Sequence, residues 1–167
     1  MQKMLKLGWI LFSITAIMGF ILGGVQSMTK GPIAESRAKQ KLEALAYTLP
    51  GAKEFKELAV SKEFSASDSS VITQIYEGRD ASGLKGHNFM VTTKGFGGAL
   101  GLVVGISTDG QVRDIAILES SETPGLGARA SEPSFAGQFH NRSAAREFSV
   151  VKADAKGEAE IQAISGA

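Results

Sequence analysis

Residues 99–119 read Ala-Leu-Gly-Leu-Val-Val-Gly-Ile-Ser-Thr-Asp-Gly-Gln-Val-Arg-Asp-Ile-Ala-Ile-Leu-Glu, with apolar runs on either side of Asp109-Gly110. An Asp-Gly pair between such runs is among the strongest short-range signals for a β-hairpin, because both turn positions then accept a positive φ. The returning run keeps Val112 and Ile115 at apolar positions. The stretch predicts an antiparallel hairpin, and we expect it to lie at the heart of a sheet.

Two further strands are expected before this hairpin. Residues 71–76 and 88–93 are rich in β-branched and aromatic side chains, and the segment between them, 78–83, is rich in turn-forming residues. Together with the hairpin, these segments predict an antiparallel sheet over residues 71–119.

Helical patterns flank the predicted sheet. Pro32 opens one of them, since proline is tolerated in the first turn of a helix, and Pro50-Gly51 ends it. Lys53–Lys62 and residues 134–146 are read as two further short helices, and residues 148–152 as a strand. The fold class expected for the chain is α+β, with an antiparallel sheet and flanking helices.

The N-terminal segment is apolar enough to cross a membrane. No charged residue occurs from Leu7 to Thr29, and about 20 such residues in a helix span a bilayer core. Lys3 and Lys6 precede the segment, so the N-terminus is expected on the cytoplasmic side and the rest of the chain on the extracytoplasmic side. A cleaved signal peptide is the alternative. We expect a cytoplasmic tip and anchor at 1–29, linker helices at 30–64 and an α+β domain at 65–167.

Composition excludes several kinds of site. The 167 residues contain no cysteine, so a disulfide scaffold, a thiolate metal site and a cysteine nucleophile are ruled out. The formal net charge is +1, which gives no reason to expect nucleic acid as a partner. His87 and His140 do not form a metal-ligand spacing, and we expect neither a metal site nor a catalytic residue set.

Two glycine-containing segments stand out. Gly95-Phe96-Gly97-Gly98 leads into a strand and not a helix, which argues against a dinucleotide-binding loop; its glycines let a flat group or another strand come close. Glu122–Gly127, Glu-Thr-Pro-Gly-Leu-Gly, follows a strand, and its Thr-Pro-Gly is a turn signal. This loop could offer backbone N–H groups and Leu126 to a planar heterocycle, with Gly127 exposing further backbone, or it could be an ordinary tight turn.

These features together resemble the FMN-binding domain shared by the G subunit of Rnf electron-transport complexes and the C subunit of sodium-pumping NADH:quinone reductases. The resemblance rests on the N-terminal anchor, the Gly95–Gly98 turn before a strand, the Glu122–Gly127 loop and the terminal Ser165-Gly166-Ala167. The length of the chain favours the Rnf protein.

The resemblance implies FMN as cofactor, bound through a phosphate ester to the threonine of an S-G-A-T motif. The sequence ends at Ala167, where that threonine would be the next residue, and we expect the chain to be a fragment. Lys94 and Arg129 could neighbour the phosphate or the ring, or they could be solvated surface charges. The residues that the resemblance places at the cofactor are Gly97, Gly98, Glu122, Thr123, Pro124, Gly125, Leu126, Gly127, Ser165, Gly166 and Ala167.

The function implied is that of a flavin electron carrier in a membrane complex that couples ferredoxin:NAD⁺ electron transfer to ion translocation. Its partners would be the other membrane subunits. Two alternatives stay open: an anchored scaffold protein without a cofactor, and a flavin-binding subunit of another respiratory system.

Overall fold

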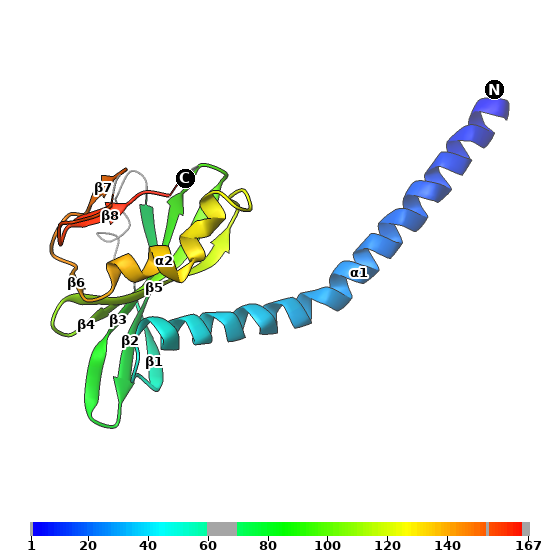
Figure 1. Ribbon diagram of the computed structural model, residues 1–167. Helices are drawn as coiled ribbons and strands as arrows, with labels where there is room; N and C mark the ends of the chain where they lie inside the picture. Colours follow the sequence, from blue (N-terminus) through cyan, green and yellow to red (C-terminus); the bar gives the residue numbers. More distant parts are fainter. Residues whose placement is uncertain (1, 60–69, 153, 165–167) are drawn as a thin grey trace. The chain divides into compact units, whose positions relative to one another are not determined.

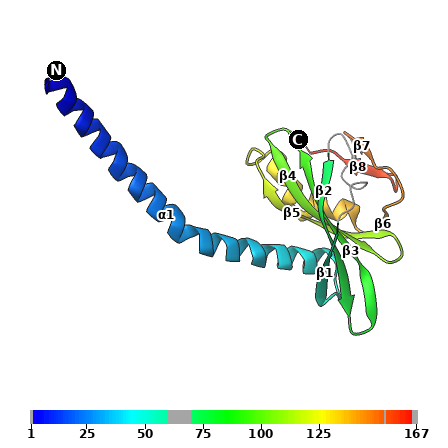
Figure 2. The same ribbon diagram turned by 180° about the vertical axis from the view of Figure 1, so that it is seen from behind.

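The computed structural model describes residues 2–59, 70–152 and 154–164, and Figures 1 and 2 show its elements. The chain divides into two compact units between Gln40 and Lys41, and each is described by itself. The first helix, α1 (Gln2–Thr48), contributes to both units.

In the first unit, α1 is the one helix within the described residues that is long and apolar enough to cross a membrane. The hydroxyl of Ser13 donates to the Trp9 carbonyl at 2.8 Å, and that of Thr15 donates to the Leu11 carbonyl at 3.1 Å. These bonds give the hydroxyl groups a hydrogen-bond partner within the helix itself. A hydroxyl in the apolar interior of a membrane needs such a partner, because no water is available there.

The expected helix start at Pro32 is wrong, because α1 runs through this residue without a break. Proline removes one backbone N–H and crowds the preceding turn, so its cost is local. Helical residues on both sides propagate the helix one hydrogen bond at a time and need no new nucleus.

The second unit is built on a six-stranded sheet whose strands lie in chain order, each antiparallel to the next. The strands are β1 (Glu54–Leu58), β2 (Ser70–Asp80), β3 (Gly83–Lys94), β4 (Ala99–Ser107), β5 (Gln111–Ser120) and β6 (Arg142–Ser143). The predicted antiparallel sheet and hairpin are confirmed: Val104 pairs with Ile115, and Gly110 takes the positive φ, +77°, that its turn requires.

The two faces of the sheet are covered by different helical segments. Val103 lies in a core cluster with Leu45 of α1, whereas the next residue, Val104, packs against a second cluster that contains Ala136. Successive residues of a strand point to opposite faces, so the end of α1 covers one face and the short helices after β5 cover the other. These helices are η2 (Gly127–Ser131), α2 (Pro133–Ala136) and η3 (Gly137–Phe139).

The last turn of α1 lies directly on β3 and β4. The Asn88 side-chain amide, fully buried, donates to the Leu45 carbonyl at 3.0 Å. A Cβ on Gly105 would lie 1.9 Å from the Thr48 carbonyl oxygen, so only glycine permits this approach. The sheet is therefore fixed to the end of α1 by backbone contact.

Two expected helices after α1 are corrected. The predicted helix at Lys53–Lys62 is wrong where the structure describes it, because Glu54–Leu58 is an edge strand paired with β2; residues 60–62 lie outside the described residues. The helix expected at 134–146 is limited to α2 and η3. Asn141 then adopts a φ of +57°, and the chain returns to the sheet as β6.

The strand expected at 148–152 is confirmed as β7 (Ser149–Val151), which pairs in parallel with β8 (Glu160–Gln162).

Candidate functional site

The side chain of Glu122 joins the two glycine segments that the sequence singled out. Its Oε1 accepts a hydrogen bond from the Gly97 N–H at 3.0 Å. The turn that contains Gly97 is itself closed by a hydrogen bond of 2.8 Å from the Gly95 N–H to the Gly98 carbonyl. The segment before β4 and the loop after β5 therefore form one junction, centred on the Glu122 carboxylate.

Side chains at the glycines around this carboxylate would crowd the Glu122 loop. A Cβ on Gly95 would lie 2.1 Å from Glu122 Oε1, and one on Gly127 would lie 2.5 Å from Oε2. A Cβ on Gly97 would lie 2.6 Å from the Ser121 carbonyl oxygen. The glycines thus permit the close approach that the sequence predicted, and the group that approaches is the loop of Glu122.

The second oxygen of this carboxylate lacks a partner within the described chain. Glu122 Oε2 is buried and accepts no hydrogen bond there. A buried acceptor left unpaired is costly and is uncommon away from functional sites. The junction thus holds an acceptor that no described donor satisfies.

The loop beyond Glu122 is a tight turn that presents Leu126. The Leu126 N–H donates to the Thr123 carbonyl at 3.1 Å, and Gly125 has the φ of +79° that a type II turn requires at its third residue. Leu126 is 45% exposed, so its outward position is confirmed. The expectation that Gly127 exposes its backbone is wrong, because Gly127 is buried against Glu122.

The outer surface of the junction suits a planar ring. Phe96 is 86% exposed at the tip of one turn, and Leu126 is exposed on the other. No atom lies within 4 Å of the position a Cβ on Gly125 would take, so the backbone there is open to approach. Exposed apolar side chains and open backbone can contact a planar ring, so the residues present fit FMN.

The Ser165-Gly166-Ala167 tail lies outside the described residues, but the strand that leads to it is well held. The Gln162 N–H donates to Gln138 Oε1 at 2.6 Å, and Gln138 Nε2 donates to the Gln162 carbonyl at 3.3 Å. The side-chain amide of Gln138 thus makes with Gln162 the pair of hydrogen bonds that a residue of a neighbouring strand would make. The Ala163 N–H donates to the Val151 carbonyl at 2.8 Å.

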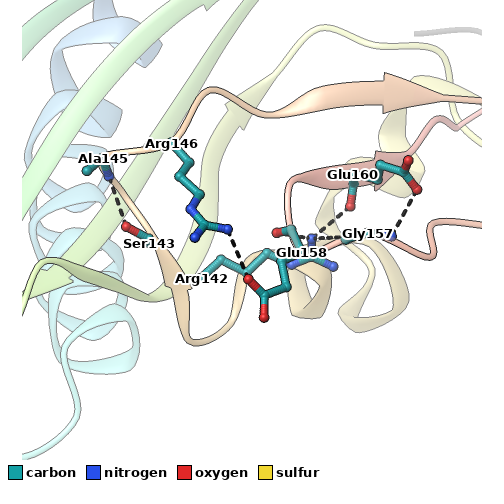
Figure 3. Close-up of polar contacts among 7 residues, drawn as sticks. All are labelled: Arg142, Ser143, Ala145, Arg146, Gly157, Glu158 and Glu160. Carbon is teal, nitrogen blue, oxygen red and sulfur yellow. Dashed lines mark hydrogen bonds and ion pairs between the residues drawn. The ribbon is translucent and has the colours of Figure 1, made fainter.

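The turn before β8 is braced by Arg142, as Figure 3 shows. Arg142 Nη1 donates to the carbonyls of Gly157, Glu158 and Glu160 at 3.1, 2.6 and 2.9 Å. The Glu160 carboxylate accepts from the backbone N–H groups of Lys156 and Gly157, and these bonds hold the pKa of Glu160 below its ordinary value.

A groove of about 510 Å³ adjoins this brace and is lined by Arg142, Arg146 and Lys156 together with Glu158. The Arg146 guanidinium is paired with Glu158 at 3.0 Å. Sequence reasoning identified neither Gln138 nor Arg142, and no motif marks them, because each acts on backbone that is 15 or more residues away.

Comparison with known proteins places this site in a family. Residues 95–167, which contain both glycine segments and the tail, match the FMN-binding domain. The chain is 34% identical to the G subunit of the Na⁺-translocating ferredoxin:NAD⁺ oxidoreductase complex of Acetobacterium woodii, over 96% of this chain and 81% of that protein. It is 32% identical to the G subunit of the proton-translocating ferredoxin:NAD⁺ oxidoreductase complex of Clostridium ljungdahlii, over 90% of this chain and 75% of that protein.

Among solved structures, the crystal structure of Shewanella oneidensis NqrC shares the fold, with a TM-score of 0.56 at 16% identity, over 77% of this chain and 85% of that one. The class of protein is thus one that carries an FMN-binding domain, at residues 95–167. The two G-subunit relatives match most of the chain at 34% and 32% identity, which narrows the family from FMN-binding domain proteins in general to one kind of subunit. The chain belongs to the G subunits of ion-translocating ferredoxin:NAD⁺ oxidoreductase complexes.

Proposed function

We propose that this chain is the flavin-carrying electron-transfer subunit of a membrane-bound, ion-translocating ferredoxin:NAD⁺ oxidoreductase complex. The relatives from A. woodii and C. ljungdahlii, which are subunits of such complexes, support this function. The single observation that carries it is the junction at Glu122, which unites two glycine segments inside the region that matches the FMN-binding domain. Its partners would be the other membrane subunits of the complex.

The chain's own residues bind and orient the cofactor. When bound, FMN supplies the redox chemistry, and the protein positions the ring and tunes its potential. Leu126, which is exposed, would contact the ring, and the open backbone at Gly125 and the Gly97–Gly98 turn would be available to its polar edge. Glu122 holds these two segments in register, and Thr123 and Pro124 set the turn that presents Leu126.

The FMN phosphate is esterified to the threonine that we expect to follow Ala167. The Ser165-Gly166-Ala167 sequence supports this attachment, since it is the beginning of the motif that the resemblance implies. An ester bond would retain the flavin even where free FMN is scarce.

A direct test uses the full-length protein on a denaturing gel viewed under ultraviolet light. We expect a fluorescent band, because a covalent flavin survives denaturation. Replacing the residue after Ala167 by alanine should abolish the fluorescence, whereas Thr108→Ala, which removes an exposed hydroxyl outside the site, should keep it. A full-length wild-type protein without fluorescence would overturn the covalent attachment and would favour a scaffold protein without a cofactor.

We propose that the domain after the anchor lies on the extracytoplasmic side of the membrane. The support is the N-terminal flank, where Lys3 and Lys6 precede the apolar segment and no acidic residue occurs. Because the sequence contains no cysteine, single cysteines can report sidedness. With a membrane-impermeant thiol reagent, Thr108→Cys at the exposed β4–β5 turn should be labelled in spheroplasts, and Gln2→Cys only after permeabilisation. The reverse pattern would contradict the orientation.

A further inference from the structure

A second cavity lies where the chain approaches its tail. It is open to solvent on one side and has a volume of about 320 Å³. The helices after β5 and the segments around β7 and β8 border it, and its lining includes Arg129, Gln138, Lys152 and Ile164. Arg129 lies two residues beyond Gly127, the last residue of the glycine junction, and Ile164 directly precedes Ser165. The residues that line the cavity therefore fall, in sequence, between the glycine junction and the tail, the two parts of the proposed flavin site.

Chain length ties the cavity to the attachment point. The residue after Ala167 is four positions beyond Ile164, and an extended chain advances at most about 3.5 Å per residue, so the two lie within roughly 14 Å of each other. The backbone of Gln162 is held by Gln138, so the tail leaves from a fixed point on the cavity wall. A phosphate attached to that residue stays near the cavity.

The cavity is positively charged. Arg129 and Lys152 line it, and no acidic side chain is among the described residues that do so. Arg129 Nε is 3.5 Å from Glu132 Oε2, a long contact between two exposed groups, which neutralises the guanidinium only weakly. Lys152 makes no ion pair with any residue that the structure describes. The side-chain amide of Gln138 is already engaged by Gln162, so the two cations are the charged groups left to bind a ligand.

We propose that Arg129 and Lys152 bind the phosphate of FMN, so that this cavity is the phosphate subsite and the junction at Glu122 is the ring subsite. This inference rests on the proposed function. A phosphodiester keeps one negative charge at neutral pH, and cationic side chains pair with it by charge-assisted hydrogen bonds. The two residues would then make the site select the phosphorylated flavin over riboflavin.

The test compares the affinities of FMN and riboflavin for one protein. It uses the full-length chain in detergent, with the residue after Ala167 replaced by alanine so that no attached flavin fills the site. We expect FMN to bind about tenfold more tightly than riboflavin at low salt, a preference that two exposed charge contacts can supply. The preference should shrink at high salt, where exposed charges are screened.

The double variant Arg129→Gln/Lys152→Gln should bind both flavins about equally, with its riboflavin affinity unchanged, which also reports that the fold is intact. Arg129→Lys/Lys152→Arg keeps both charges and should keep the preference. Lys56→Gln is the matched control, since Lys56 is an exposed cation of β1 that does not line the cavity. If the double variant fails to fold, Lys152→Gln alone should lower the preference about threefold, because this change breaks no ion pair with a residue that the structure describes.

The outcomes separate the two proposals. An undiminished preference for FMN in the double variant would overturn the phosphate subsite and leave the proposed function standing. Loss of the preference in Lys56→Gln would do so as well. If the full-length chain that carries only the alanine replacement after Ala167 binds FMN and riboflavin equally well, the phosphate subsite is likewise overturned and the proposed function stands. Binding of neither flavin would overturn the proposed function, and the phosphate subsite with it.

Discussion

Glu122 and Gly97 are 25 residues apart in the sequence, and the carboxylate of the first accepts a hydrogen bond from the backbone N–H of the second at 3.0 Å. This bond couples the turn before β4 to the loop after β5. It extends the link between these segments beyond the last paired residues of the ladder, Leu100 and Ser120, and it can be tested by changing Glu122.

Removing the carboxylate should loosen the junction. Glu122→Ala leaves the Gly97 N–H without its acceptor and empties the space between three glycines, so we expect the free energy of unfolding to fall by about 1–3 kcal/mol. Glu122→Gln retains an acceptor oxygen and should lose less. Urea denaturation of the full-length protein in detergent measures both. Equal loss in the two variants would contradict the role given to Oε1.

The space around Glu122 gives a second prediction. Gly127→Ala puts a Cβ 2.5 Å from Glu122 Oε2, so we expect it to destabilise the protein by about 1–3 kcal/mol and to lower its flavin content. Gly101→Ala is the control, because its Cβ would meet its nearest neighbour, Glu119, at an ordinary 3.6 Å. A Gly127→Ala protein as stable and as flavin-rich as the control would contradict the close packing at the junction.

The hold of Gln138 on β8 should be visible in hydrogen exchange. Gln138→Ala removes the acceptor of the Gln162 N–H, whereas the Ala163 N–H keeps its bond to the Val151 carbonyl. We expect the Gln162 amide to exchange about fivefold faster in the variant, with a smaller change at Ala163, since a lost hydrogen bond is worth about 1 kcal/mol. Unchanged exchange at Gln162 would show that other contacts fix the strand.

The turn before β8 should weaken in acid. Backbone N–H groups lower the pKa of Glu160 in the folded protein below the ordinary 4.5, so the folded state binds its proton less readily than the unfolded state does. The resulting stability is present above pH 4.5 and is lost as the pH falls through the lowered folded value. Unfolding measured against pH should show a smaller acid loss in Glu160→Gln than in the wild type. Identical profiles would contradict the role of this carboxylate.

The centre of the sheet is predictable from the sequence because its signals are local. Asp109-Gly110 and the apolar runs beside it specify a hairpin within about 20 residues, and the pairing of Val104 with Ile115 confirms it. Gly125 likewise behaves as a Thr-Pro-Gly turn predicts.

The sequence predicts the wrong secondary structure where a non-local contact or a longer helix determines the conformation of a segment. In Glu54–Leu58, the apolar residues Phe55 and Leu58 are three apart, a spacing that suits a helix. Pairing with β2 makes the segment a strand. The preference of proline for the first turn predicts a helix start at Pro32, but helix on both sides of this residue overrides that preference.

Only the parts of the candidate site are visible in the sequence. The glycines of both segments and the Glu122–Gly127 loop stand out by composition. That the Glu122 carboxylate is the group for which these glycines make room, and that Gly127 is buried by it, follows from a pairing across the sheet that no local pattern encodes. Gln138 and Lys152 lack a motif and gain significance only from their place beside the end of β8.

The measurement that tests the central claim most directly is a density map of the full-length, flavin-loaded protein in its native assembly. The account predicts an isoalloxazine ring beside Leu126 and the Gly95–Gly98 turn, joined through its phosphate to the residue after Ala167. A map with that junction empty, or with the ring held elsewhere on the chain, would contradict it.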